Sequence, residues 1–431
     1  MRYLPLVLTL FAISVVTDVA AAPLGRREVL PNAMRLLVAE RPAIPIVVVR
    51  LFVRAGSAYD PSDTPGLANL TAELLTRGTA RRTGPQLDQA IEFVGGSLEA
   101  TASRDGVTVS LNVLKKDLEL GLDLLAEVIL TPTFPEDELK RKVAEIQASL
   151  RRSEENPEVV AGREMTKLLY PNHPYGHPVP GTIESVGQLT REQVVGFHRR
   201  HYRPDMAVVA VVGDVTVDAI RQGLGRRFAG WTAPAEAPVQ IPPAPENPPV
   251  EQRTIKRDLT QATVLLGRPG VRQVHPDYFP LIVANYILGG GSASQLYTRV
   301  REERGFAYFV HSNLSPGRYG ASYIVSLQTR LDAVDEAVRL VKEEMVSLGK
   351  GSVPAGALDL AKSFLIGSLP LRLDTSGKVA DFLINIEENG LGLDYPDRFR
   401  TEVAKVTAAD VERVSARYLA PATFSSVIVR K

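Results

Sequence analysis

The sequence contains no cysteine and only six histidines among its 431 residues. Disulfide bonds, thiolate metal sites and a cysteine nucleophile are therefore excluded, and any metal site would need histidine, aspartate or glutamate ligands. An excess of one charge is also missing, because 50 Lys and Arg residues face 49 Asp and Glu residues. This balance does not indicate a nucleic-acid partner or an anionic membrane surface. With 45% hydrophobic residues, the composition is that of a globular protein.

Long apolar runs are scarce too, and the one at the N-terminus is typical of a signal peptide. Arg2 precedes the apolar run Leu4–Val16, and Ala20–Ala22 supplies the small residues of a cleavage site. The run is short for a membrane span and Asp18 ends it, which favours a signal peptide over a membrane anchor. We expect residues 1–22 to be removed on export. The mature protein would then be soluble, without a membrane span, and periplasmic if the organism is a bacterium.

A proline-rich stretch divides the mature chain into two parts of similar size. Residues 232–250 hold seven prolines and no glycine, which predicts a stiff, extended connector between residues 23–231 and 251–431. Both parts close with the same pattern, which begins at Thr190 in the first and at Thr407 in the second. The pattern is a capped amphipathic helix, an aromatic-proline turn and a β-branched strand. We therefore expect two homologous domains that arose by duplication and face each other.

Each part combines strand patterns with helix patterns. Residues 44–53 and 260–270 are rich in β-branched residues and open the two parts as strands. Apolar residues alternate from Val107 to Val113, as in a half-buried strand. Leu118, Leu122, Leu125 and Ile129 then form one stripe of a helix. The sequence therefore predicts an α+β fold in which each domain is an antiparallel sheet with helices packed on it.

Four segments together resemble a known family. They are RAGSAYDPSDTPGLA at 54–68, LLTRGT at 74–79, GGSLEATASRD at 95–105 and LGGGSASQLYTRVREERGFAY at 288–308. These segments are similar to the pitrilysin/insulinase/mitochondrial-processing-peptidase family of zinc metallopeptidases, and the resemblance covers nearly the whole mature chain. It implies that the two domains form half of a clam-like chamber.

The catalytic helix of that family carries H-x-x-E-H, whose two histidines bind zinc and whose glutamate activates water. At the matching positions this sequence has Asn69, Ala72 and Glu73, so both imidazoles and the base are replaced. The resemblance places the third ligand at Ser149 or Ala148. It therefore implies a domain with a degenerate metal site and no metal ligands of its own.

A different metal site at the same place remains an alternative. Asn69, Glu73 and Glu145, the nearest carboxylate on the later helix, would make an oxygen-rich site that suits zinc poorly. Such a site would hold Mg²⁺ or Ca²⁺ weakly. We expect instead that Glu73 is salt-bridged or solvated.

The histidines do not replace the lost ligands. His173 and His177 lie in the proline-rich stretch YPNHPYGHP, which argues against a helix that would align them. His198 and His201 do lie in a predicted helix, next to two arginines, and we expect them on a surface face.

An arginine and a tyrosine follow the glycine-rich loop seven residues apart. In family members that work as pairs, the subunit without the zinc motif carries this arrangement, and Arg301 and Tyr308 stand at those positions. The resemblance implies that both side chains reach the partner's zinc site, where they are suitable donors for a substrate carbonyl or an oxyanion. Gly305 would end the helix and aim Tyr308 differently from Arg301. Alternatively, Arg301 pairs with a neighbouring glutamate and Tyr308 is a half-buried strand residue.

The glycine-rich loop itself is a candidate substrate-binding element. Gly289, Gly290 and Gly291 lack the spacing and the Lys-Ser/Thr ending of a phosphate loop, so the pattern does not indicate nucleotide binding. In the family this loop lies at the mouth between the two halves. Flexible glycines there would let the chamber open and close around a peptide.

Two functions from different classes follow from these patterns. In the first, the chain is the inactive subunit of a heterodimeric zinc-dependent peptidase. It needs a related partner that bears H-x-x-E-H and holds the zinc, and its substrates are peptides. In the second, the chain is a scaffold or peptide-binding protein without a catalytic role. An autonomous hydrolase with altered metal ligands is a third reading, which the loss of both histidines and of the base opposes.

Overall fold

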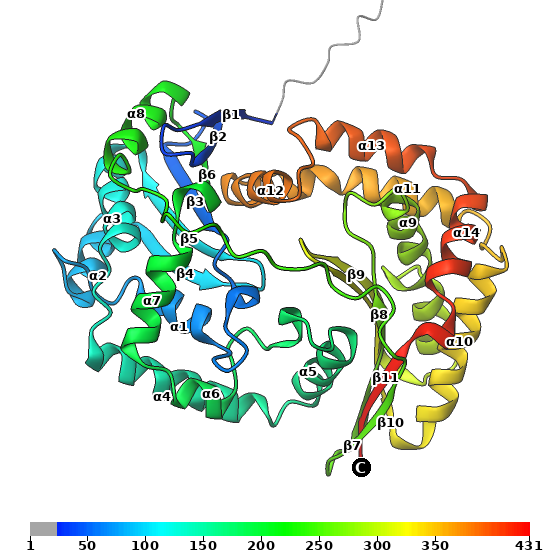
Figure 1. Cartoon of the computed structure of the whole chain (residues 1–431). Coiled ribbons are helices and arrows are strands. Elements are labelled where there is room, and N and C mark those ends of the chain that lie inside the picture. Colours follow the sequence, from blue (N-terminus) through cyan, green and yellow to red (C-terminus); the bar gives the residue numbers. More distant parts are fainter. Residues whose placement is uncertain (1–23) are drawn as a thin grey trace, which may run out of the picture.

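The computed structural model describes residues 24–431, so the predicted signal peptide lies outside the described residues. The α+β fold is confirmed: a six-stranded sheet and a five-stranded sheet each carry a layer of helices. Figure 1 shows the two resulting lobes side by side, the first coloured blue to green and the second green to red.

The first sheet has the strand order β1-β2-β6-β3-β5-β4. Its neighbouring strands are antiparallel, except that β2 and β6 run parallel. β6, near the centre, is buried along its whole length, and β5 shows the predicted alternation of buried and half-buried residues. The strand bounds are β1 Arg26–Val29, β2 Arg35–Glu40, β3 Ile46–Val53, β4 Ser97–Ala102, β5 Val107–Leu114 and β6 Ala207–Gly213.

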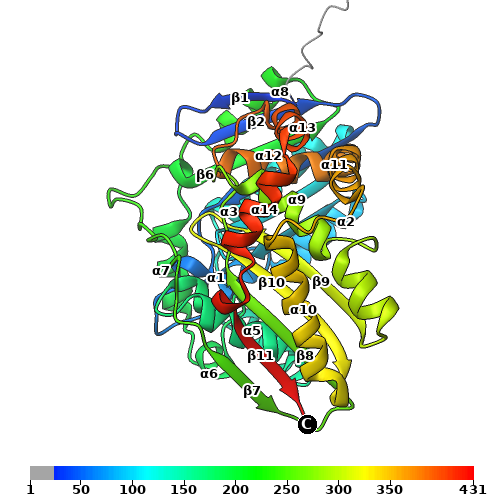
Figure 2. The same cartoon turned by 90° about the vertical axis from the view of Figure 1, so that its right-hand side faces the viewer.

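The second sheet repeats this arrangement. Its order is β7-β11-β8-β10-β9, and its one parallel pair, β7 with β11, corresponds to β2 with β6. Figure 2 shows this sheet with α10 and α14 lying over one face. The shared topology supports a duplicated origin of the two lobes. The bounds are β7 Gln252–Lys256, β8 Gln261–Pro269, β9 Ala307–Pro316, β10 Ala321–Arg330 and β11 Ser425–Arg430.

The helices begin where the sequence predicts capping. Thr190 and Thr407 form capping boxes with Gln193 and Asp410, so the two closing helices start alike. The bounds are α1 Leu67–Leu74, α2 Gly84–Phe93, α3 Leu118–Leu130, α4 Glu136–Ser153, α5 Pro157–Leu169, α6 Ile183–Gly187, α7 Arg191–His201, α8 Val217–Arg227, α9 Tyr278–Gly289, α10 Val334–Gly349, α11 Ala357–Gly367, α12 Ser376–Glu388, α13 Tyr395–Lys405 and α14 Ala408–Tyr418. None of the helices in residues 24–431 is long and apolar enough to cross a membrane.

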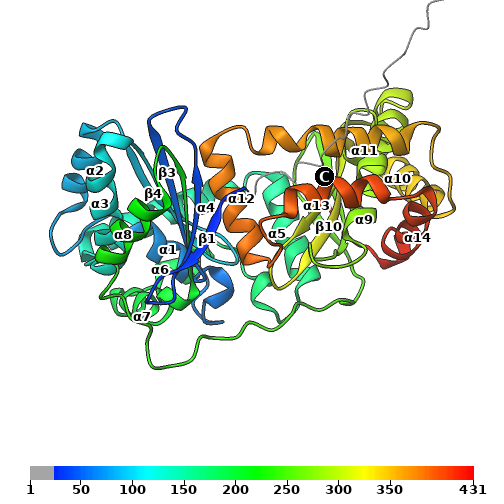
Figure 3. The same ribbon diagram turned by 90° about the horizontal axis from the view of Figure 1, so that it is seen from above.

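One helix of each lobe covers the sheet of the other. α12 of the second lobe packs on β3 and β6, and α5 of the first lobe packs on β8 and β11. Figure 3 shows α12 lying between the lobes. Ion pairs reinforce both contacts: Glu388 of α12 accepts from Arg54 at 2.6 Å and from Arg35 at 3.0 Å, and Glu164 of α5 lies 3.0 Å from Arg253.

The proline-rich connector between the lobes contains neither helix nor strand. Residues 232–250 run along one side of the molecule from the first lobe to the second (Figure 3). The connector is anchored on its way, because the carbonyl oxygen of Pro242 accepts a hydrogen bond from His173 at 2.9 Å and the amide of Ala244 donates to Tyr319 at 2.7 Å. It is therefore a fixed part of the surface as well as a spacer.

Candidate functional site

The N-terminus of α1 is held by a buried carboxylate. Asp60 accepts hydrogen bonds from the amides of Gly66 at 2.8 Å and Ala68 at 2.7 Å, which would otherwise lack partners. Burial raises the pKa of Asp60 to about 7, although both backbone hydrogen bonds act in the opposite direction. Gly66 has φ +97°, and a Cβ there would lie 2.9 Å from the carbonyl oxygen of Pro180. The start of α1 therefore requires glycine, and the helix has a defined position.

The degenerate motif lies on this helix. The amide of Asn69 donates to Glu73 Oε1 at 3.1 Å, and Glu73 Oε2 lies 3.4 Å from Lys142 Nζ. Lys142 also contacts Glu145 at 3.1 Å, so its ammonium group lies near both carboxylates. The expected salt bridge of Glu73 is confirmed. Ala72, at the position of the base, is fully buried.

No cluster of three or more metal-ligating histidine, aspartate or glutamate side chains exists within residues 24–431. The residues that are present suit a divalent cation poorly, because a lysine ammonium lies beside the two carboxylates that would bind it. The sequence did not predict that Lys142 belongs to this site. The signal that could have shown it is its position three residues before Glu145 on a predicted helix, a spacing at which the two side chains can form an ion pair.

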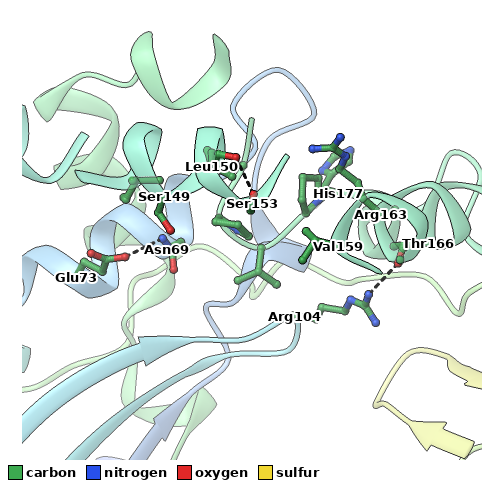
Figure 4. Close-up of a pocket in the computed structure, with 17 residues that line it drawn as sticks. Asn69, Glu73, Arg104, Ser149, Leu150, Ser153, Val159, Arg163, Thr166 and His177 are labelled. Atoms are coloured by element: carbon green, nitrogen blue, oxygen red, sulfur yellow. Dashed lines mark hydrogen bonds between the residues drawn. The ribbon is translucent and has the colours of Figure 1, made fainter. Parts of the chain in front are cut away.

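A cavity of about 430 Å³ opens beside the degenerate motif. Figure 4 shows Ser149 of α4 next to Asn69 of α1, so the structure brings these two predicted positions together. The walls come from α1, α4, α5, the turn between β4 and β5, and the loop that follows Tyr175. The lining residues are Asn69, Glu73, Arg104, Ile146, Ser149, Leu150, Ser153, Val159, Gly162, Arg163, Thr166, Gly176, His177, Pro178, Val179, Pro180 and Gly181.

The expected surface position of the α7 histidines is wrong. His201 is only 8% exposed and packs against Phe197 with ring centroids 4.5 Å apart. His198 donates from Nε2 to the carbonyl oxygen of Ile129 at 2.9 Å. Burial lowers the pKa of both imidazoles to about 4, so both are neutral near pH 7. Packing under the helix decided their position, while the neighbouring arginines face solvent.

The loop histidines lie outside any helix longer than one turn, as predicted. His173 is buried, accepts from the amide of Tyr175 at Nδ1 and donates to Pro242 from Nε2. His177 lines the cavity, and its Nδ1 is buried with no hydrogen-bond partner among the described residues.

Arg301 and Tyr308 come together on the surface of the second lobe. Arg301 lies in a short π-helix, Tyr297–Glu303, and Tyr308 in β9. The Arg301 guanidinium donates to the hydroxyl of Tyr297 at 2.8 Å, and its Cζ lies 5.2 Å from the ring centroid of Tyr308. Gly305 has φ +61° and lies between the π-helix and β9, so it ends the helix as predicted. Arg301 and Tyr308 therefore come from two different elements that meet at this turn.

The alternative placements of this pair are not observed. Arg301 forms no ion pair with a glutamate in the described part of the chain. Tyr308 is 77% exposed and is not a half-buried strand residue.

The glycine-rich loop is closely packed where it leaves α9. A Cβ at Gly289 would lie 2.6 Å from Ser312 Oγ on β9, and a Cβ at Gly290 would lie 2.7 Å from the Cα of Tyr286. A Cβ at Gly291 would lie 3.2 Å from the hydroxyl oxygen of Tyr286. Close contact therefore accounts for at least the first two glycines, without any need for flexibility.

Comparison with known proteins identifies the family. The model described as "Insulinase (Peptidase family M16)" matches residues 35–183, and "Peptidase M16 inactive domain" matches residues 188–365. An uncharacterized zinc protease of Mycobacterium leprae is 32% identical, over 81% of this chain and 79% of its own. The chain belongs to the insulinase family of M16 peptidases.

Other similar proteins carry both peptidase and non-peptidase names. A "non-peptidase homolog" of Helicobacter pylori is 24% identical over 91% of this chain and 90% of its own. The crystal structure titled "peptidase M16 inactive domain" from Pseudomonas fluorescens has a TM-score of 0.89 at 27% identity, covering 94% of this chain and 97% of its own. A Helicobacter pylori protease structure shares the fold, with a TM-score of 0.88 at 20% identity over 95% of this chain and all of its own.

The residues of α1 decide what type of M16 member this chain is. Asn69, Ala72 and Glu73 supply neither the imidazoles nor the base of an M16 metal site, and the model named for the inactive domain matches residues 188–365, which follow this helix in the chain. The chain is therefore an M16 family member whose α1 has the inactive form of the motif.

Proposed function

We propose that this M16 protein is the non-catalytic subunit of a two-chain zinc peptidase. A related partner bearing H-x-x-E-H would supply zinc, water and base. This chain would supply half of the chamber together with Arg301 and Tyr308. We also propose that it is exported, and periplasmic if the organism is a bacterium, because of the N-terminal sequence pattern.

The Arg301–Tyr308 pair, with Arg301 half-buried and Tyr308 exposed, is the observation that carries this proposal. The arginine is held by the hydroxyl of Tyr297 and by two aromatic rings, with Cζ 4.7 Å from the Tyr297 centroid and 5.2 Å from that of Tyr308. Such contacts order a guanidinium without neutralising it. The side chain of Tyr308 stays open to solvent. A positioned cation and a phenol are suited to an oxyanion that forms in another subunit's site.

Peptide binding by strand addition is compatible with the sheet edges. Among the strands of residues 24–431, β4 pairs only with β5 and β9 pairs only with β10, so each leaves one side of its backbone without a partner from these strands. An unfolded peptide could hydrogen-bond there through its main chain. In the family the edge that binds substrate belongs to the catalytic subunit, so the edges of this chain would serve a supporting role.

The test is reconstitution with the partner. The tagged chain is purified from its native host, the bound proteins are sequenced, and hydrolysis of a quenched fluorescent peptide is measured with the recovered partner. We expect Tyr308→Phe and Arg301→Gln each to lower kcat about 100-fold while the two chains still assemble, because both donors act on charge that forms in the transition state.

Arg304→Gln is the matched control, because Arg304 is exposed on the same turn and forms no ion pair within residues 24–431. It should leave kcat unchanged. Normal turnover by both the Tyr308 and the Arg301 variants would remove the pair from the mechanism.

A scaffold or peptide-binding protein is the second candidate. The loss of the metal site in this chain and the relative named a non-peptidase homolog favour it. Recovery of the chain alone, or only with proteins unrelated to M16 peptidases, would select this function over the first.

A further inference from the structure

The cavity beside α1 has two ends of different character. Asn69 and Glu73 lie at one end, and Arg104, Arg163 and His177 lie toward the other (Figure 4). Apolar side chains contribute most of the remaining wall. They are Ile146, Leu150, Val159, Pro178, Val179 and Pro180.

Arg104 is a cavity-lining cation that has no ion-pair partner among the described residues. Its Nη2 donates to Thr166 Oγ1 at 3.3 Å, and its Cζ lies 5.8 Å from the ring centroids of both Tyr170 and Tyr175. These contacts order the guanidinium, but all of them are with neutral groups. No carboxylate in residues 24–431 forms an ion pair with it. An ordered arginine with free N–H groups is suited to binding a carboxylate through two hydrogen bonds.

The neighbouring carboxylates are already engaged. Asp105 accepts a hydrogen bond from the Tyr175 hydroxyl and another from the amide of Arg318 at 3.2 Å. Glu154 accepts from Arg163 at 2.9 Å, so Arg163 is neutralised within the protein. Among the described residues at this end of the cavity, Arg104 is therefore the cation left to pair with an added carboxylate.

His177 provides a second, independent sign of a missing ligand. Its Nδ1 lies buried without a hydrogen-bond partner among the described residues, and the residue lines the same cavity. A buried polar atom without a partner is destabilising, so such atoms are rare in folded proteins unless something else satisfies them. Burial and the nearby His173 lower the pKa of this imidazole, so it is neutral near pH 7. A neutral ring can accept a hydrogen bond at Nδ1, or donate one, without adding charge.

We propose that this cavity binds a short, otherwise apolar peptide through a carboxylate that pairs with Arg104. The peptide would run from Arg104 along the apolar wall toward Asn69. A volume of about 430 Å³ lies within the usual range of ligand pockets. The choice of ligand rests on the proposed function, because every cleavage by a peptidase partner creates a peptide with a new C-terminal carboxylate. An acidic side chain is the other source of the same group.

Titration calorimetry on the full mature chain without any partner tests this proposal. The probes are an N-acetylated tetrapeptide of alternating alanine and leucine with a free carboxylate, its C-terminal amide, and an amide of the same length with one internal aspartate. We expect the free acid to bind at least about tenfold more tightly than the plain amide, since a hydrogen bond to a charged group contributes that much. The aspartate-containing amide shows whether a side-chain carboxylate serves as well as the C-terminal one.

Variants locate the binding. Arg104→Gln should abolish the preference for the acid, and Arg104→Lys should retain part of it. Arg151→Gln is the control and should retain all of it, because Arg151 is exposed on α4 and does not line the cavity. Thermal unfolding followed by circular dichroism checks that each variant is folded.

Equal binding of the acid and the amide by the wild-type chain, or binding of neither, would overturn the proposal whatever the variants do. An unchanged preference in folded Arg104→Gln would overturn the role of Arg104. These outcomes are separable from the proposed subunit function. They need no partner, and a failed reconstitution of peptidase activity would leave an observed acid preference intact.

Discussion

At the residue scale, the degenerate motif on α1 keeps a positive charge where the matching M16 residues would hold zinc. Lys142 Nζ lies 3.4 Å from Glu73 and 3.1 Å from Glu145, so an ammonium balances both carboxylates. A lysine needs no coordination geometry, and it offers no Lewis acidity. The local charge is therefore satisfied while the chemistry that a metal provides is absent.

This arrangement predicts that zinc binding can be restored. The quadruple variant Asn69→His/Glu73→His/Lys142→Ala/Ser149→Glu places two imidazoles at i and i+4 on α1 and a carboxylate on α4, and it removes the ammonium group that would repel a cation. We expect it to bind about one Zn²⁺ per chain, since three such ligands and a water form a tetrahedral site. Metal content after gel filtration measures this. The matched variant has Ala148→Glu in place of Ser149→Glu and should remain metal-free; zinc in that variant alone would move the ligand position to residue 148.

At the element scale, α7 packs against the first lobe through two neutral histidines. Their pKa values fall from 6.5 to about 4 because the rings are buried, and arginine charges act in the same direction on His201. Between these values the unfolded chain binds protons that the folded chain does not. The stabilising effect of burying neutral rings is therefore complete above pH 6.5 and is lost as the pH falls toward 4.

We predict that His198→Gln/His201→Phe flattens the pH dependence of stability. Each histidine contributes a slope of about 1.4 kcal/mol per pH unit between pH 4 and 6.5. Urea unfolding at several pH values measures the slope. The raised pKa of Asp60 acts with the opposite sign, so the informative quantity is the difference between wild type and variant. An unchanged slope would mean that the two rings titrate normally in the folded chain.

At the scale of the whole molecule, the lobes depend on each other through the exchanged helices. Val208, Ala210 and Val212 of β6 are fully buried in one apolar cluster with Val379 and Leu383 of α12. The second sheet repeats this arrangement, because residues of β11 lie in one cluster with residues of α5. Each sheet thus has one face that its own lobe does not cover.

We therefore predict that residues 24–231 do not fold alone. The truncated chain would expose the β3–β6 face that α12 covers, and a patch of buried valines in water favours aggregation. Circular dichroism and binding of a hydrophobic dye measure the outcome. Co-expression with residues 232–431 should restore a folded complex, because the contacts between the lobes are non-covalent. A soluble 24–231 fragment with a cooperative melt would show that the lobes are independent.

Local patterns in the sequence determined much of this fold and the identity of the degenerate site. The alternation in β5, the capping boxes of α7 and α14 and the proline-rich connector are short-range features, because neighbouring residues create them. Asn69, Ala72 and Glu73 were assigned through the resemblance to the peptidase family, whose motif occupies adjacent turns of one helix. The repeat also predicted two similar lobes.

Only the tertiary structure decided which distant residues meet. Long-range packing buried His201, brought Lys142 to Glu73 and left Arg104 without a carboxylate beside a cavity that no single segment forms. The exchange of α5 and α12 could not be predicted from the sequence either. An amphipathic pattern shows that a helix packs on an apolar surface, but it does not show which surface. The parallel strand pair in each sheet was likewise decided by the tertiary structure, since strand direction depends on connections through the whole lobe.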